Sequence, residues 1–194
     1  MILIYEKLKN KQIILASQSP RRQELLQQMG LNFTVKPLHI DESYPIDLKK
    51  GKITEFITEK KSKEFGELSE NQILITADTI VWHKGKCLEK PKDRESAIQM
   101  LLNISAEKHT VFTSISVRTF NSFHLKTDKA KVYFNEMSLA EIAHYVNNFK
   151  PYDKAGAYGI QDFLGLAKIS KIKGSYFTVM GLPTHILYEI LNEF

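Results

Sequence analysis

Residues 15–22 combine the side chains that proteins use to bind phosphate. Two hydroxyls, on Ser17 and Ser19, precede the guanidinium groups of Arg21 and Arg22. An apolar strand runs directly into a helix here, and the unpaired N–H groups and positive dipole of a helix start favour an anion. Guanidinium groups add strong donors for phosphate oxygens. A capped surface helix with solvated arginines is the alternative, but cations in a first turn oppose the dipole, which favours the anion site.

A single aspartate follows a continuous apolar run. Asp78 comes directly after residues 73–77, which have the length and composition of a buried strand. Sheets of α/β proteins usually place their functional groups where strands end. A carboxylate at such a position can bind a divalent metal, or orient and deprotonate a water molecule. A plain turn or capping aspartate fits the sequence equally well.

Residues 150–161 are rich in small side chains and also carry Tyr158 and Gln161. Small residues let a backbone approach a ligand closely. The Tyr158 ring can stack on a base, and the Gln161 amide offers both a donor and an acceptor for a base edge. An ordinary glycine-rich turn is the alternative interpretation of this segment.

Several common kinds of site are missing from the sequence. It holds no G-x-x-x-x-G-K-[ST] phosphate loop and no G-x-G-x-x-G dinucleotide fingerprint. The 6 His never have zinc-ligand spacing, and the single Cys87 cannot form an internal disulfide, which fits a reducing compartment. Lys61, Lys90 and Glu42 are further charged candidates, although each taken alone is typical of a solvated side chain.

The chain of 194 residues has the size of one domain or of two closely fused lobes. Its composition, with 43% hydrophobic and 25% charged residues, is that of an ordinary globular protein and argues against disorder. The net charge of +5 suits an anionic partner, either nucleic acid or a small phosphate compound. The apolar start at residues 1–4 is too short for a signal peptide, and no apolar run could span a membrane. A cytoplasmic protein is expected.

Strand and helix signals alternate along the chain. Strands are predicted at residues 12–16, 32–36, 73–77, 79–83, 109–120, 123–134, 167–172 and 176–179. Helices are predicted to begin at Ser19-Pro20, Ile53, Asp93, Ser138 and Pro183, with a polar, mobile loop over 37–51. Such mixing predicts an α/β or α+β fold with a mixed β-sheet and flanking helices.

Apolar spacing also predicts which faces of two helices are buried. The inner face of the helix at 53–65 is predicted to be Ile53, Phe56, Ile57 and Phe65, with its lysines further round. The helix capped by Asp93 is predicted to bury Ala97, Ile98, Leu101 and Leu102.

Taken together, these segments resemble the Maf family of nucleoside triphosphate pyrophosphatases. The order and spacing of the matching blocks carry the resemblance, since any one block is weak. The blocks are residues 15–22 with 24–26, then 61–63, 77–79, 90–91, 153–161 and 176–183.

The resemblance implies a single Maf-like domain over residues 1–194, an α/β fold with two lobes around a cleft, akin to the ITP pyrophosphatases. It implies cleavage of a nucleoside triphosphate between its α- and β-phosphates, with Mg²⁺ or Mn²⁺ as cofactor. Asp78 would act as the acid/base carboxylate and Glu42 would help to hold the metal. The residues that would bind the phosphates are Ser17, Arg22, Lys61 and Lys90.

Base selection in this family falls on positions that match Arg21, Thr79 and Gln161. These three residue types resemble the subgroup that prefers dTTP and UTP. The resemblance also suggests a homodimer. Four residues depart from the family's usual pattern: Thr76 stands in place of Gly, Lys150 in place of Glu, Ser62 in place of Ala and Glu89 in place of Gly. The lysine at 150 bears on the metal site, because the usual carboxylate there could have joined it.

Three alternatives remain open from the sequence. The first is a pyrophosphatase for purine or modified nucleotides, and the second is a nucleotide-binding regulator of cell division without turnover. The third is a basic RNA-binding domain. Against RNA, the aromatic residues Phe33, Phe56, Phe112 and Phe134 have the spacing of core positions rather than of an exposed stacking row. Neither a nucleic acid nor a membrane is expected as a partner.

Overall fold

The computed structural model describes residues 4–194 and builds one mixed, seven-stranded sheet with helices beside it. The sheet order is β2-β1-β3-β5-β6-β7, with β4 paired to β3. The strands are β1 (Gln12–Leu15), β2 (Phe33–Val35), β3 (Gln72–His83), β4 (Lys86–Leu88), β5 (Lys108–Arg118), β6 (Phe123–Phe134) and β7 (Ile169–Lys173). The helices are α1 (Ile4–Lys7), α2 (Pro20–Gln28), α3 (Gly51–Glu64), α4 (Arg94–Ile104), α5 (Leu139–Phe149), η1 (Ala155–Ala157), α6 (Phe163–Lys168), α7 (Tyr176–Met180) and α8 (Thr184–Leu191).

Strand pairing makes the sheet mixed. β1 pairs in parallel with both β2 and β3, whereas β4 and β7 pair antiparallel with β3 and β6. The first part of β3 is fully buried at Ile73, Leu74 and Ile75, as expected for a strand in the interior of a sheet. The predicted α/β class with a mixed sheet and flanking helices is confirmed.

The chain divides into two compact units. The first unit comprises residues through Asp78, Thr113–Asp128 and Gly181–Phe194, and the second comprises Thr79–Phe112 and Lys129–Met180. Strands β3, β5 and β6 supply residues to both units. The single domain expected over 1–194 stays a prediction, and the start at residues 1–3 lies outside the described residues.

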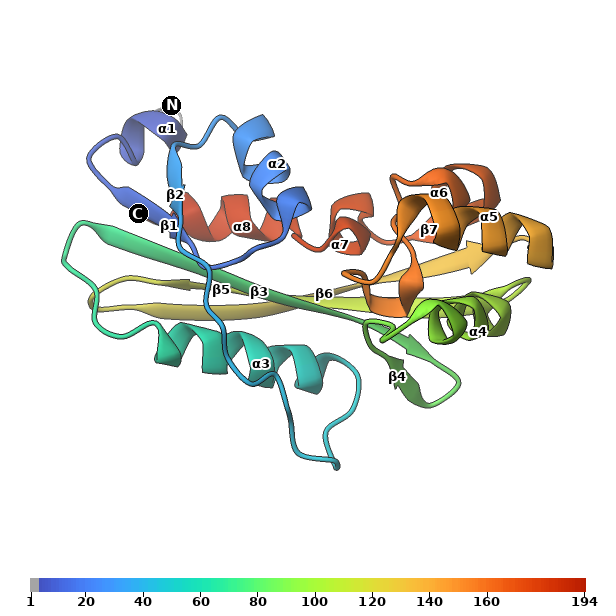
Figure 1. Cartoon of the computed structure of the whole chain (residues 1–194). Helices are drawn as coiled ribbons and strands as arrows, with labels where there is room; N and C mark the ends of the chain where they lie inside the picture. The colour runs from blue at the N-terminus through green and yellow to red at the C-terminus, as the bar shows by residue number, and fades with distance from the viewer. Residues whose placement is uncertain (1–3) are drawn as a thin grey trace. The chain divides into compact units, whose positions relative to one another are not determined.

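In the first unit, helices cover both faces of the strands. Figure 1 shows α2 and α8 on one side of β1 and β3, and α3 on the other. α2 begins with the predicted proline after Ser19 and buries Leu25 and Leu26. α3 packs on β5, where the Thr58 hydroxyl donates to the Ser114 carbonyl at 3.3 Å.

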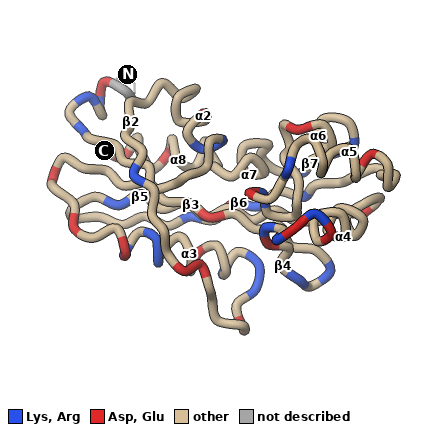
Figure 2. The backbone as a smooth tube through the Cα atoms, in the orientation of Figure 1, with Lys and Arg blue, Asp and Glu red and all other residues tan. Residues whose placement is uncertain are grey.

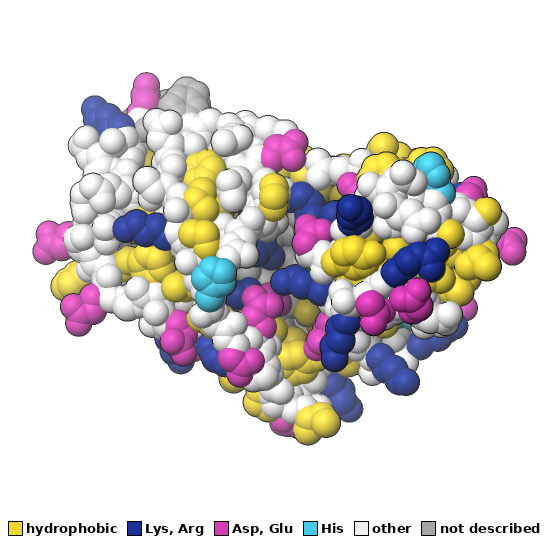
Figure 3. All heavy atoms as spheres, in the orientation of Figure 1, with side chains coloured by type: hydrophobic (Ala, Val, Ile, Leu, Met, Phe, Trp, Pro, Cys, Tyr) yellow, Lys and Arg dark blue, Asp and Glu magenta, His cyan; other side chains and the backbone are white. Residues whose placement is uncertain are grey.

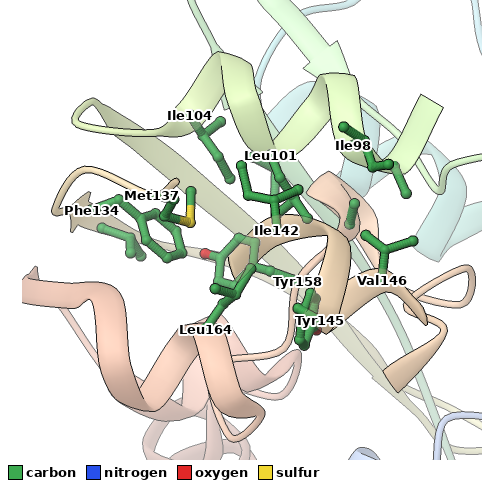
Figure 4. Close-up of a cluster of buried hydrophobic side chains, with 14 of the residues drawn as sticks. Ile98, Leu101, Ile104, Phe134, Met137, Ile142, Tyr145, Val146, Tyr158 and Leu164 are labelled. Atoms are coloured by element: carbon green, nitrogen blue, oxygen red, sulfur yellow. The ribbon is translucent and has the colours of Figure 1, made fainter. Parts of the chain in front are cut away.

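In the second unit, α4 and α5 pack around an apolar cluster. Figure 4 shows side chains of both helices meeting with those of Phe134, Tyr158 and Leu164. Both helices begin with the predicted signals, since Asp93 and Ser138 each form a capping box with the residue three positions later. Local capping therefore sets where these helices start, and the apolar cluster sets how they pack.

Two predicted strands prove to be one. The segments 73–77 and 79–83 form the single strand β3, so Asp78 lies within a strand and not at its end. The prediction of a break there was wrong because the Asp78 carboxylate has a partner in Lys61, which allows the strand to continue through a buried charge.

The strand predicted at residues 176–179 is also wrong. Residues 176–179 lie in the helix α7, although Tyr, Phe, Thr and Val favour strands. β7 pairs with β6 instead, and Gly174 leaves that strand at a φ of 123° against the backbone of Ala130. β7 ends the sheet order and the residues that follow it form α7, so tertiary context overrides the local preference for a strand.

The predicted buried faces need two corrections. On α3, Phe56 is exposed, and the buried residues are Ile53, Thr54, Ile57, Thr58, Lys61 and Ser62. On α4, Leu102 is exposed and Ile104 is buried in its place. Phe56 was predicted to be buried because it is apolar, but the side of α3 that faces β3 and β5 forms hydrogen bonds through hydroxyl groups.

Within residues 4–194, no helix is both long and apolar enough to cross a membrane.

Candidate functional site

A buried lysine of the first unit binds two carboxylates. The Lys61 ammonium lies 2.9 Å from Oδ1 of Asp78 and 2.7 Å from Oε1 of Glu42. Lys61 and Asp78 are each only 7% exposed, whereas the Glu42 side chain is 43% exposed. A protected carboxylate and an accessible one therefore converge on the same cation.

The regular geometry of β3 and α3 explains why the ion pair between Lys61 and Asp78 forms. Alternate side chains of a strand share a face, so Thr76 and Asp78 of β3 point to the same side. On a helix, residues three or four apart are neighbours, so Lys61 continues the face that carries Thr54 and Thr58. This face of α3 lies against β3, because the Thr76 hydroxyl donates to the Thr58 carbonyl at 2.9 Å.

Arg22 extends the charged cluster at the start of α2. Its Nη1 donates to the Ser17 hydroxyl at 3.1 Å, and its Nε donates to the Gly181 carbonyl at 2.8 Å. The Ser17 hydroxyl also accepts the backbone N–H of Ser19 at 3.2 Å. These bonds fix a guanidinium group at the start of a helix, where the positive end of the helix dipole favours an anion. Arg21, which directly precedes Arg22, is half-buried.

The charges of the cluster act on one another. Burial lowers the pKa of Arg22, and the positive charge of Arg21 lowers it further, while Asp78 and Glu42 oppose both. Burial likewise raises the pKa of Asp78, against the opposing effect of Lys61 and Arg22. A carboxylate with a raised pKa is a better proton acceptor than an ordinary aspartate, which suits acid/base work.

The segment between β2 and α3 brings Glu42 to the cluster. Contacts of the residues just before Glu42 hold it: the Gln18 amide lies 3.1 Å from Nε2 of His39, and the Lys60 ammonium donates to the Asp41 carbonyl at 2.6 Å. Figure 2 shows acidic and basic residues following one another along α3 and this segment. The segment is a loop as predicted, and its predicted mobility stays a prediction.

The donor set fits a hard divalent cation. Carboxylate oxygens are the ligands that Mg²⁺ and Mn²⁺ prefer. Glu42 is accessible and already has a cation 2.7 Å away, so its position accepts positive charge. Across residues 4–194, no three His, Cys, Asp or Glu side chains are grouped to hold a metal. Water and substrate oxygens would therefore have to complete the coordination.

Three of the predicted site residues belong to the second unit. Thr79 follows Asp78 in β3 and is half-buried, Lys90 is exposed beyond β4, and Gln161 is half-buried before α6. The structure thus brings together the candidates of the first unit, namely Ser17, Arg21, Arg22, Glu42, Lys61 and Asp78. The roles of the other three stay predictions.

The interpretation of the glycine-rich segment needs correction. Tyr158 is 5% exposed and its hydroxyl lies 2.7 Å from Nε2 of His109, so its ring is not free to stack on a base. Gly156 has a φ of 69° and lies against Val81, and a side chain at Gly159 would meet the carboxylate of Asp162. These small residues let the chain pack on itself, and they are not evidence of a ligand.

Sequence reasoning missed the hydroxyl groups beside the ion pair. Thr54, Thr58 and Lys61 recur at helical spacing, and Ser114 and Ser116 alternate along β5. Polar residues at core-facing positions of both elements were the signal that could have found them. The Gly181 carbonyl, which accepts from Arg22, had no such local signal, because the two residues lie 159 positions apart.

Charge is mixed on the face drawn in Figure 3, where Lys and Arg side chains lie among Asp and Glu side chains. The positive net charge therefore does not form one continuous basic surface on that face. A localised group of cations, such as Arg21, Arg22 and Lys61, suits a compact anion better than a long polyanion.

Comparison with known proteins identifies the family. Residues 12–194 match the family described as Maf-like protein. The chain is 48% identical over 191 residues to the dTTP/UTP pyrophosphatase of Flavobacterium johnsoniae, covering 98% of both chains. It is 46% identical to the protein of the same name in Christiangramia forsetii, again over 98% of each, and 43% identical to that of Bacteroides thetaiotaomicron, over 94% and 95%. The chain belongs to the Maf family.

Proposed function

We propose that this chain hydrolyses dTTP and UTP to the nucleoside monophosphate and pyrophosphate, with Mg²⁺ or Mn²⁺ bound. The observation that carries the proposal is the buried Asp78 carboxylate, held by Lys61 beside the accessible Glu42 and the Arg22 guanidinium. The substrate comes from the relatives, since those at 43–48% identity are named dTTP/UTP pyrophosphatase.

The first task of the site is to neutralise the substrate. A nucleoside triphosphate carries about four negative charges, which oppose attack at phosphorus. Arg22 and Lys61 supply positive charge, and Ser17 supplies a hydroxyl donor. Lys90 is proposed as a further phosphate ligand. A divalent cation, which Glu42 would help to hold, adds charge neutralisation and polarises phosphate oxygens when bound.

The second task is to activate water. Asp78 accepts a proton from a water molecule placed in line with the α-phosphorus. The bond between that water oxygen and the α-phosphorus forms while the bond from the α-phosphorus to the bridging oxygen breaks, and pyrophosphate leaves. The ammonium of Lys61 keeps Asp78 ionised before the step, and burial of Asp78 makes its carboxylate more basic.

The third task is base selection, proposed for Arg21, Thr79 and Gln161. Hydrogen-bonding groups discriminate strongly, because a wrong base leaves buried donors or acceptors without partners. The double variant Arg21→Trp with Gln161→Glu should weaken the preference for pyrimidines. An unchanged ranking of substrates in that variant would remove these residues from the proposal.

The deciding experiment measures pyrophosphate release from a panel of ribo- and deoxynucleoside triphosphates with Mg²⁺ or Mn²⁺. Faster release from dTTP and UTP than from purine nucleotides supports the proposal. A different ranking keeps the reaction but replaces the substrate by a purine or modified nucleotide. Tight nucleotide binding without release would make the chain a nucleotide-binding regulator and would overturn the proposal.

The proposal also places the enzyme in the cytoplasm as a homodimer. The lone Cys87, half-buried in β4, supports a reducing compartment. Light scattering of the purified chain after size-exclusion chromatography tests the dimer, because the mass of a single chain is 22.3 kDa. A mass near that value at micromolar concentration would remove the dimer from the proposal.

A further inference from the structure

Thr76 connects three elements of the first unit through one hydroxyl group. Its side chain is fully buried, and its Oγ1 donates to the Thr58 carbonyl of α3 at 2.9 Å. The same oxygen lies 2.8 Å from the Ser116 hydroxyl of β5. The strand that carries Asp78 is thereby bonded to the helix that carries Lys61.

This bond lies directly beside the ion pair. Thr76 precedes Asp78 by two positions and shares its face of β3. Thr58 precedes Lys61 by three positions and shares its face of α3. The hydrogen bond from Thr76 to Thr58 and the ion pair from Lys61 to Asp78 are therefore two successive links between the same two elements.

Other hydroxyl groups bond α3 to a different strand. The Thr54 and Ser114 hydroxyls lie 2.6 Å apart, and the Thr58 hydroxyl donates to the Ser114 carbonyl at 3.3 Å. These bonds hold α3 on β5. The bonds that reach β3, the strand of Asp78, are the link made by Thr76 and the ion pair itself, and these two lie nearest to the Asp78 carboxylate.

We infer that Thr76 is a positioning residue, whose hydroxyl sets α3 along β3 so that the Lys61 ammonium stays at Oδ1 of Asp78. The inference rests on the proposed function for its effect on turnover, but the placement of Lys61 is a separate and directly measurable property. Displacements of about 1 Å at a reacting group can cost large factors in rate. Loss of a single positioning hydrogen bond should therefore be visible in kcat.

The experiment compares Thr76→Val, which keeps the branched shape but removes the hydroxyl, with Thr76→Ser, which keeps the hydroxyl. kcat for dTTP should fall about 10-fold in Thr76→Val and return to within about twofold of the parent in Thr76→Ser. If Thr76→Val fails to fold, Thr76→Ala carries the same prediction.

Ser116→Ala is the matched control. It removes the other partner of the Thr76 hydroxyl and leaves the bond to Thr58 in place. Its stability should fall less than that of Thr76→Val, because it loses only the bond between the two hydroxyls, whereas Thr76→Val also loses the bond to the Thr58 carbonyl. Its kcat should nevertheless stay within about twofold of the parent. An equal loss of kcat in both variants would reduce Thr76 to a structural residue and overturn the inference.

A second measurement does not depend on turnover. Acetic anhydride should label the buried Lys61 slowly, with Lys63, whose side chain is 73% exposed, as internal reference in mass spectrometry. Labelling of Lys61 should rise at least about threefold in Thr76→Val and stay at the parent level in Thr76→Ser and Ser116→Ala. Unchanged labelling in Thr76→Val overturns the inference. A parent that labels as expected but releases no pyrophosphate overturns only the proposed function.

Discussion

The two units bury different chemistry beside their helices. In the first unit, the surroundings of α3 contain the buried polar residues Thr54, Thr58, Lys61, Ser62, Thr76, Asp78, Ser114 and Ser116. In the second unit, α4 and α5 enclose an apolar cluster that includes Ile98, Leu101, Ile104, Phe134, Ile142, Val146 and Leu164 (Figure 4). α3 thus buries polar side chains beside Ile53 and Ile57, whereas α4 and α5 pack on apolar ones.

The difference separates stability from chemistry. Apolar burial is favourable in proportion to area, so the second unit gains stability from each residue of its cluster. Buried polar groups cost free energy unless they are paired, so the hydrogen bonds beside α3 mainly offset their own burial. Substitutions near α3 should therefore change the rate most, and substitutions in the second unit should change the free energy of unfolding most.

The largest effect should come from Asp78→Asn. Asparagine has nearly the same shape but cannot accept the proton of the attacking water, so kcat should fall at least ~100-fold. The matched control is Asp93→Asn, which keeps a capping residue in the second unit and should leave kcat unchanged. Circular dichroism should show that both variants fold. Turnover at the parent rate in Asp78→Asn would end the assignment of Asp78 as acid/base residue.

Gly165→Ala should change the free energy of unfolding by about as much as Asp78→Asn changes the activation free energy of the reaction. A methyl group there would collide with the carbonyl groups of Gly159 and Ile160, which belong to the backbone and cannot turn away. The free energy of unfolding should fall by about 3 kcal/mol in urea titrations. Leu166→Ala on the same helix, at a side chain 75% exposed, should change it little. Equal effects of the two substitutions would contradict the tight packing of α6.

The next effect concerns pH and His109. Burial and, to a lesser extent, the neighbouring His83 together lower the pKa of His109 to about 3, well below its ordinary value of 6.5. The unfolded chain then binds a proton that the folded chain does not, so stability is complete above pH 6.5 and is lost as the pH falls toward 3. Between pH 7 and pH 5 the loss from this group should be about 2 kcal/mol.

The variant His109→Gln isolates that contribution. Glutamine does not titrate, so its free energy of unfolding should fall less between pH 7 and pH 5 than that of the parent. Chemical denaturation at both pH values measures the difference, and any constant loss from the changed contact with Tyr158 cancels in it. Equal slopes in parent and variant would show that His109 is not held neutral in the folded protein.

The smallest effect should be a gain in stability from Ser62→Ala. Among residues 4–194, Ser62 has a buried hydroxyl that finds no hydrogen-bond partner, which costs free energy. Alanine removes the hydroxyl and should raise the free energy of unfolding by up to about 1 kcal/mol. Thr54→Val, which removes a hydroxyl that does have partners, should lower it. A loss of stability in Ser62→Ala would mean that its hydroxyl is paired in solution.

The sequence alone determined the elements that depend on near neighbours. The capping boxes at Asp93 and Ser138, the proline at the start of α2 and the apolar run before Asp78 each involve residues within a turn or a short strand. The ordered blocks also identified the Maf family, which the comparison confirmed. Such signals are local, so periodicity and capping suffice to read them.

Only the tertiary structure decided which side chains meet. A loop brings Glu42 to Lys61, and the Gly181 carbonyl near the end of the chain accepts from Arg22 near its beginning. Packing also turned Tyr158 inward to His109 and made a helix of Tyr176–Met180. The physical reason is the same in each case: these outcomes depend on partners far away in sequence, whose distance and burial no local pattern contains.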